Sequence, residues 1–279
     1  MNLVAIIQAA VLGIVEGLTE FLPISATGHL ILARALLGLR HDAVARAFDV
    51  AIRSGALLAL VVVMRSRVLQ AVVALCAAAR RRPLGAILSI GVLAAALVGL
   101  GPAHLFEADL FTGPVIAAAL AAGALAILWV ERRGAEARIR VRRLEDLAWT
   151  QALAIGALQC LGLVPGVSRT GAAVIGGMAL GLSRAVATDF ALLLAVPTLL
   201  VATACSGWDQ RHELGTIVAA NEACFAVGFG AAFFAAWVCL RWLRRVVATH
   251  AYVAFAWYRL ALALVVLASW LTGMIRWAP

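Results

Sequence analysis

The chain has 279 residues, of which 65% are hydrophobic and 13% charged, and its mean hydropathy is +1.02. Soluble globular proteins have about 45–50% apolar and about 25% charged residues, so this composition excludes a water-soluble fold. All 23 basic residues are arginine, and with 14 acidic residues they give a formal net charge of +9. The arginines form short clusters between apolar runs, which argues against nucleic-acid binding and favours contact with anionic membrane lipids.

The apolar runs predict an all-α integral membrane protein, because a helix needs about 20 apolar residues to cross a bilayer. Six runs are long enough to be full spans, namely residues 47–64, 84–105, 110–130, 185–206, 216–240 and 252–275. Residues 68–79 are too few to cross and are predicted to lie at the membrane interface.

Two further apolar regions, residues 3–39 and 148–182, are each interrupted near the middle by a turn rich in Pro, Gly, Ser and Thr. Irregular backbone at membrane depth is tolerated only where protein buries it or where it lines a wet cavity. Both regions are therefore predicted to be re-entrant helical hairpins, which enter the membrane and return to the same side.

Clusters of arginine predict the orientation, because loops on the cytoplasmic side carry an excess of positive charge. Three clusters are assigned to the cytoplasm, and they lie at residues 65–82, 132–143 and 241–245. The first hairpin is then expected to enter from outside and the second from the cytoplasm. Arg34, Arg40 and Arg46 do not follow this rule.

The two interrupted regions also resemble each other in sequence. Residues 8–28 align with residues 151–171, and the alignment matches a Gln, a Gly, a Leu, a Pro and a Ser-x-Thr-Gly. We expect a single membrane domain of two inverted repeats, about residues 1–140 and 141–279, each made of a re-entrant hairpin and three transmembrane helices. In folds of this kind the broken-helix tips meet near the midplane and form the binding site.

The first hairpin carries ionisable residues, which are costly inside a membrane and so require a partner or a function. Glu16 and Glu20 lie four residues apart and share one helix face. Two carboxylates this close repel each other, which would raise one pKa or recruit a cation. His29 follows just after the turn, and the three residues together predict acid–base or metal chemistry. A structural pairing of the two acids with arginines elsewhere is the alternative.

The second hairpin presents Ser168, Arg169 and Thr170 at a turn that opens a helix and is flanked by Gly166 and Gly171. Free backbone N–H groups at a helix start, together with a guanidinium, form an anion site suited to phosphate. The two glycines would let the backbone approach the anion closely. An ordinary helix start with an interfacial arginine is the alternative.

Together the two tips suit a phosphate or diphosphate ester with a lipid tail, with a divalent cation at Glu16 and Glu20 neutralising charge.

Two other embedded charges are less decisive. Arg53 either faces the same cavity or pairs with Asp49 one turn earlier. Arg259 is expected to form a structural ion pair.

In these residues the chain resembles the undecaprenyl-diphosphate phosphatase family, also called the bacitracin-resistance proteins. The motifs EGLTEFLPISATGH (residues 16–29) and PGVSRTG (residues 165–171) resemble its two signatures, and the similarity runs along the whole chain. The resemblance implies a bacterial inner-membrane enzyme that hydrolyses undecaprenyl diphosphate to the monophosphate lipid carrier of wall synthesis. It also implies a site open to the periplasm and a need for Mg²⁺ or Ca²⁺.

Carried over by position, the family's acids fall on Glu16 and Glu20, its histidine on His29 and its arginine on Arg169. Ser25, Thr27, Ser168 and Thr170 fall on its hydroxyl positions. Ser25 is assigned a catalytic role with the acids, His29 and Arg169, and the substrate-binding residues are Thr27, Arg53, Gly166, Ser168, Thr170 and Gly171. The family's first motif has a second serine, proposed as its nucleophile, where this chain has Ala26. Ala173 replaces a threonine, and residues 53–56 differ from the usual Gln–Leu–Gly–Ser.

Two functions follow as hypotheses. The first is hydrolysis of a polyprenyl diphosphate, with Ser25, His29 or a metal-held water as the attacking group in place of the missing serine. The second is a divergent paralogue that transports a lipid phosphate without efficient hydrolysis, since inverted hairpins are typical of transporters. Whether the chain forms a homodimer stays open.

Overall fold

A computed structural model describes residues 3–39, 42–76, 88–93, 96, 110–133, 139–275 and 277. These residues are almost entirely helical, and the β pairing among them is one isolated bridge between Val141 and Leu182. The predicted all-α class is therefore confirmed. The predicted span at 84–105, together with Arg40, Arg80–Arg82 and Arg138 of the orientation argument, lies mostly or wholly outside the described residues.

Four described helices are long and apolar enough to cross a membrane, and they are α7 (Gly113–Arg132), α10 (Arg184–Asp209), α12 (Glu222–Val246) and α13 (Val253–Leu271). A fifth candidate is the pair α3 (Ala43–Val63) and α4 (Arg65–Cys76), whose axes differ in direction by 82°. Large apolar side chains such as Phe234, Val238 and Leu264 are exposed on the outer faces of these helices. The chain is thus a multi-pass membrane protein.

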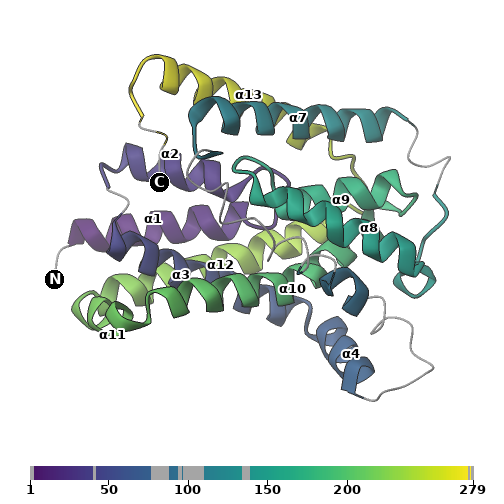
Figure 1. Cartoon of the computed structure of the whole chain (residues 1–279), viewed down its shortest axis with the longest axis horizontal. Coiled ribbons are helices and arrows are strands. Elements are labelled where there is room, and N and C mark those ends of the chain that lie inside the picture. Colours follow the sequence, from purple (N-terminus) through teal and green to yellow (C-terminus); the bar gives the residue numbers. More distant parts are fainter. Residues whose placement is uncertain are drawn as a thin grey trace.

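Each of the two interrupted regions folds as short helices joined by a turn. The first consists of α1 (Leu3–Thr19) and α2 (Ala26–Leu36), which contact each other. The second consists of α8 (Trp149–Gln159), the 3₁₀ turn η3 (Cys160–Leu163) and α9 (Arg169–Ala179). In Figure 1 the two hairpins extend from opposite ends of the molecule and their turns meet near its middle.

The first hairpin is held by close packing of α1 against α12, which lie side by side in Figure 1. Gly13 and Gly17 make this approach possible, because a Cβ at either position would collide with the α12 backbone around Ala232. Small residues at such contacts let helices approach closely and gain dispersion energy. α12 also packs on α3, and α3 and α2 contact α1 as well, so α1 is fixed from several sides.

The predicted boundary of the fifth span is wrong. Sequence reasoning placed a loop at 207–215 and a span at 216–240, whereas α10 continues to Asp209 and a separate helix, α11 (Arg211–Ala220), follows. Asn221 ends α11 in a non-helical conformation, and its side chain donates to the carbonyl of Ile217. The apolar run therefore contains a turn that hydropathy alone does not reveal.

Candidate functional site

The turn of the first hairpin forms because Pro23 cannot continue α1 and α2 begins only at Ala26. Ser25, between them, has a φ of +74°, and it is the one non-glycine residue of the described chain with a positive φ. It is also buried. Such a conformation costs about 1–3 kcal/mol and persists only where the surroundings impose it, which is common at functional sites.

The turn of the second hairpin ends at Ser168, which caps α9. Its hydroxyl accepts a hydrogen bond from the Gly171 amide at 3.0 Å, as a serine N-cap does. Gly166 adopts a φ of +94°, and a Cβ there would lie 2.6 Å from the carbonyl oxygen of Ile116. Glycine is therefore required at this position.

The two turns are hydrogen-bonded directly to each other. The Ser168 hydroxyl donates to the carbonyl of Leu22 at 3.1 Å, and the Thr170 hydroxyl donates to the carbonyl of Glu20 at 3.4 Å. The start of α9 is thereby held against the end of α1. The residues that sequence reasoning assigned to two separate tips thus belong to one structural unit.

Arg259 of α13 donates hydrogen bonds to both turns, a role that the sequence did not predict. Its buried guanidinium donates to the turn carbonyls of Pro23 at 3.0 Å and Gly166 at 3.2 Å. It also donates to the carbonyls of Ala119 and Leu120 in α7, at 3.1 Å each. The predicted ion pair is therefore replaced by four backbone carbonyls. A lone arginine in an apolar helix was the available signal, but its partners could not be read from the sequence.

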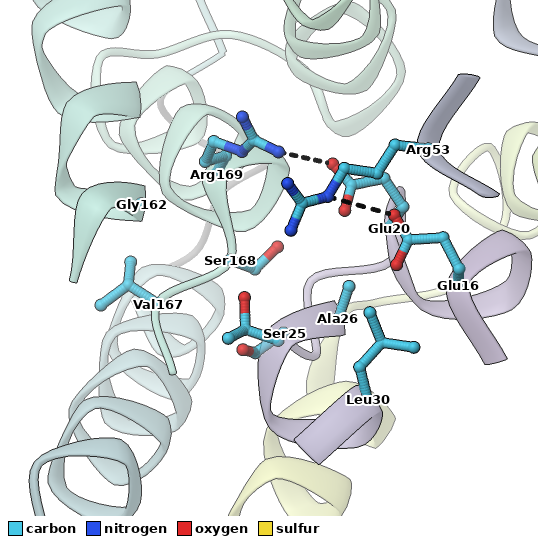
Figure 2. A pocket seen from close by; sticks show the side chains of 11 residues that line it. Glu16, Glu20, Ser25, Ala26, Leu30, Arg53, Gly162, Val167, Ser168 and Arg169 are labelled. Carbon is cyan, nitrogen blue, oxygen red and sulfur yellow. Dashed lines mark hydrogen bonds and ion pairs between the residues drawn. The ribbon is translucent and has the colours of Figure 1, made fainter. Parts of the chain in front are cut away.

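A cavity of about 40 Å³ lies where the tips meet. Its lining, most of which is labelled in Figure 2, consists of Glu16, Glu20, Ser25, Ala26, Thr27, Leu30, Arg53, Gly162, Val167, Ser168 and Arg169. Seven of the eleven residues predicted for the site are therefore brought together. Three chain segments far apart in the sequence supply the charged ones, namely α1 with the turn that follows it, α3 and α9.

Two arginines face two glutamates across this cavity (Figure 2). Arg169 Nη2 lies 3.0 Å from Glu20 Oε1 and donates a hydrogen bond to it. Arg53 Nε lies 3.9 Å from Glu16 Oε1, which is an ion pair without a hydrogen bond. Of the two alternatives left open for Arg53, the cavity is the one observed, because Asp49 pairs with Arg34 instead.

Glu16 is the least satisfied of these groups. Its side chain is 0% exposed, and neither carboxylate oxygen has a hydrogen-bond partner. A buried carboxylate without partners is costly, so its chemistry favours a cation or a proton at this position. Glu16 and Glu20 together therefore fit the predicted divalent cation. No group of three or more His, Cys, Asp or Glu side chains suited to a metal was found in the described ranges, so protein ligands alone would hold it weakly.

Four predicted site residues do not line the cavity. Thr170 and Gly171 lie in the contact between the turns, where Gly171 packs against Pro23, and Gly166 packs against Ile116 of α7. His29 lies on another face of α2, where its Nδ1 donates to the Ser25 carbonyl at 2.7 Å. Its Nε2 is 2.7 Å from the hydroxyl oxygen of Tyr258, and the two rings stack. The structure therefore does not bring His29 into the cavity with the acids.

Comparison with known proteins gives a full-length match. Residues 9–265 match the family described as Bacitracin resistance protein BacA. Similar proteins named undecaprenyl-diphosphatase occur in Acidovorax ebreus, with 46% identity, and in Variovorax paradoxus, with 45% identity, each covering 100% of both chains. Undecaprenyl-diphosphatase 1 of Stutzerimonas stutzeri is 41% identical over 100% of this chain and 99% of its own. The chain belongs to the bacitracin resistance protein BacA family.

Proposed function

We propose that this chain is a membrane phosphatase that hydrolyses undecaprenyl diphosphate to undecaprenyl phosphate and inorganic phosphate. The observation that carries the proposal is the cavity between the two turns, which presents two guanidiniums and two carboxylates below a buried serine. The names of relatives that are 41–46% identical over their full length support the same activity and the same substrate.

In this proposal the arginines bind the diphosphate. A guanidinium offers paired N–H donors that match two phosphate oxygens, and two of them suit a substrate with two phosphoryl groups. Arg169 also lies at the first turn of α9, where free backbone N–H groups and the helix dipole favour an anion. Binding would exchange the carboxylate partners of Arg53 and Arg169 for phosphate oxygens.

Glu16 and Glu20 are the residues that would hold a divalent cation, Mg²⁺ or Ca²⁺. When bound, the cation supplies positive charge that neutralises the diphosphate oxygens. A carboxylate not engaged in this way can accept the proton released by the attacking group. Glu20 is partly exposed to the cavity, so it is the better placed of the two for that role.

Ser25 is the proposed attacking group, since Ala26 carries no hydroxyl and His29 lies outside the cavity. Its Oγ would form a bond to the terminal phosphorus while the bond from that phosphorus to the bridging oxygen breaks, which releases undecaprenyl phosphate. The hydroxyl proton passes to Glu20, and water then hydrolyses the phosphoserine. Direct attack by water is the alternative. The catalytic role predicted for His29 stays a prediction, and its bonds to Ser25 and Tyr258 favour positioning of the turn.

We also propose that the fold consists of two inverted repeats and that the protein lies in a bacterial inner membrane. Two hairpins that extend from opposite ends of the molecule are what two inverted repeats would produce, and the arginine clusters favour a cytoplasmic placement of residues 65–82, 132–143 and 241–245 (Figure 1). We propose with this placement that the cavity opens to the periplasm, as the resemblance implies. The apolar outer faces of the helices provide the surface for the lipid tail.

Phosphate release from undecaprenyl diphosphate by the detergent-purified chain tests the function, with and without Mg²⁺ or Ca²⁺. Arg169→Ala and Glu20→Ala are expected to abolish release while the protein still inserts and elutes as folded. Arg143→Ala, an exposed arginine outside the cavity, is the control and should leave the rate unchanged. Retained turnover in both cavity variants would exclude this assignment.

The same assay separates the proposed enzyme from the lipid transporter, which the loss of the serine at position 26 favours. An Ala26→Ser variant is measured beside the native chain. Release by the native chain means that Ser25 or water attacks, whereas release only by the variant means a phosphatase scaffold with another task. Translocation of a headgroup-labelled lipid phosphate in liposomes, without release by either protein, would establish transport.

A further inference from the structure

Glu16 lines the cavity and has fewer hydrogen-bond partners than Glu20, the other acid that lines it. Its carboxylate is fully buried, and both oxygens lack a hydrogen-bond partner. Glu20, by comparison, accepts a hydrogen bond from Arg169 at 3.0 Å. The positive charge next to Glu16 comes from Arg53, whose Nε is 3.9 Å from Oε1. That separation is too long for a hydrogen bond, so the pair is held by charge alone.

Arg53 faces both Glu16 and the cavity. Its side chain is 31% exposed, it lines the cavity, and Asp49, one turn earlier on α3, is already paired with Arg34. The guanidinium is therefore not fixed by any short hydrogen bond to a carboxylate on its own helix. An anion in the cavity would therefore compete with Glu16 for this guanidinium.

We propose that Arg53 is an internal counter-cation of Glu16 that competes with the divalent cation. This inference rests on the proposed role of Glu16 and Glu20 in holding that cation. Arg53 and a divalent cation next to Glu16 repel each other at close range in a poorly hydrated site, so each excludes the other. Without substrate, Arg53 neutralises Glu16 and the cation binds weakly. With a diphosphate present, Arg53 moves to the phosphate oxygens and leaves Glu16 to the cation.

The proposal predicts the sign of a binding change. Removal of the positive charge in Arg53→Gln leaves Glu16 without a counter-cation, and Ca²⁺ should then bind the substrate-free protein about tenfold more tightly or better, which corresponds to about 1.4 kcal/mol. If Arg53 instead supported the cation site, the same substitution would weaken Ca²⁺ binding. The variant Arg53→Lys keeps the charge and should bind Ca²⁺ like the native chain.

Calorimetric titration of Ca²⁺ into the full-length protein in detergent, at constant ionic strength, is the test. Arg67→Gln is the matched control, because Arg67 pairs with Glu145 at 3.1 Å outside the cavity, and it should not change the affinity. The double variant Arg53→Gln/Glu16→Gln should lose the gain. If the Arg53→Gln variant does not fold, the Arg53→Met variant, which removes the same charge, is used in its place.

The outcomes separate this inference from the proposed function. Unchanged or weaker Ca²⁺ binding in Arg53→Gln, or no Ca²⁺ binding by any variant, would overturn the inference, even if the native chain releases phosphate. Tighter binding in Arg53→Gln supports it, even if no variant is a phosphatase. Phosphate release is measured on the same samples, so the two conclusions do not depend on one readout.

Discussion

The buried Arg259 gives the sharpest structural prediction. It lies in the middle of α13, is 1% exposed, and binds the turn carbonyls of both hairpins as well as two carbonyls of α7. The substitution Arg259→Met keeps much of the side-chain volume and removes every donor. The expected result is a protein that is both less stable and less active.

The magnitude follows from which carbonyls lose their partner. The two carbonyls in α7 lie inside a helix, where the helical hydrogen bonds also satisfy them. Pro23 and Gly166 lie in turns, and a buried carbonyl left without a donor costs about 1–3 kcal/mol. Arg259→Met should therefore destabilise the protein by about 2–6 kcal/mol. A displacement of the turns by about 1 Å would lower the rate of phosphate release by about 100-fold.

Thermal unfolding in detergent and phosphate release on the same preparation measure both effects. Arg244→Met is the control, because Arg244 forms a partly exposed ion pair with Asp189, and such pairs contribute about 1 kcal/mol or less. Arg259→Lys should be intermediate, since an ammonium has three donors for four carbonyls. An unchanged midpoint and an unchanged rate in Arg259→Met would refute the reasoning that Arg259 holds the turns.

Two further predictions concern backbone and packing. Ser25→Gly should stabilise the fold by about 1 kcal/mol because it removes the cost of the positive φ, whereas Ser25→Ala should not. Both variants should lose phosphate release. Equal thermal unfolding midpoints for the two variants would contradict a strained backbone at Ser25. Gly17→Ala should destabilise by about 1–3 kcal/mol, because its Cβ would lie 2.7 Å from the Ala236 nitrogen. Gly230→Ala meets no atom within 4 Å and should be neutral or slightly stabilising, so a similar loss in both would exclude a specific contact.

The two hairpins could be predicted because their signal is local. A proline with hydroxyl residues and glycine in the middle of an apolar run is incompatible with a continuous span, and both breaks occur where expected. The end of α10 could not be predicted in the same way. Residues 207–215 contain Gly, Asp, Arg and Glu, yet they mostly remain helical, and the Arg211 side chain donates to the carbonyl of Trp208 where α10 meets α11.

The charged residues of the cavity could be grouped from the sequence, but the helix face on which His29 lies could not. Glu16, Glu20 and Arg169 were grouped correctly, because charges inside a membrane require partners. His29 was grouped with them because it follows the same turn, but the rotation of α2 directs its ring to Tyr258 on α13. Such a rotation depends on helices more than 200 residues away, which a local motif does not contain.

The hydrogen bonds between the turns have a consequence for how a substrate reaches the cavity. Arg259 donates to the turn carbonyls of Pro23 and Gly166, and the Ser168 hydroxyl donates to the Leu22 carbonyl, so buried hydrogen bonds tie the two tips together. A carrier that alternates its access must separate its two gates and would have to break these buried bonds in every cycle. A hydrolase needs only one entrance. For the proposed hydrolase we therefore expect the lipid headgroup to enter and leave on the same side of the membrane.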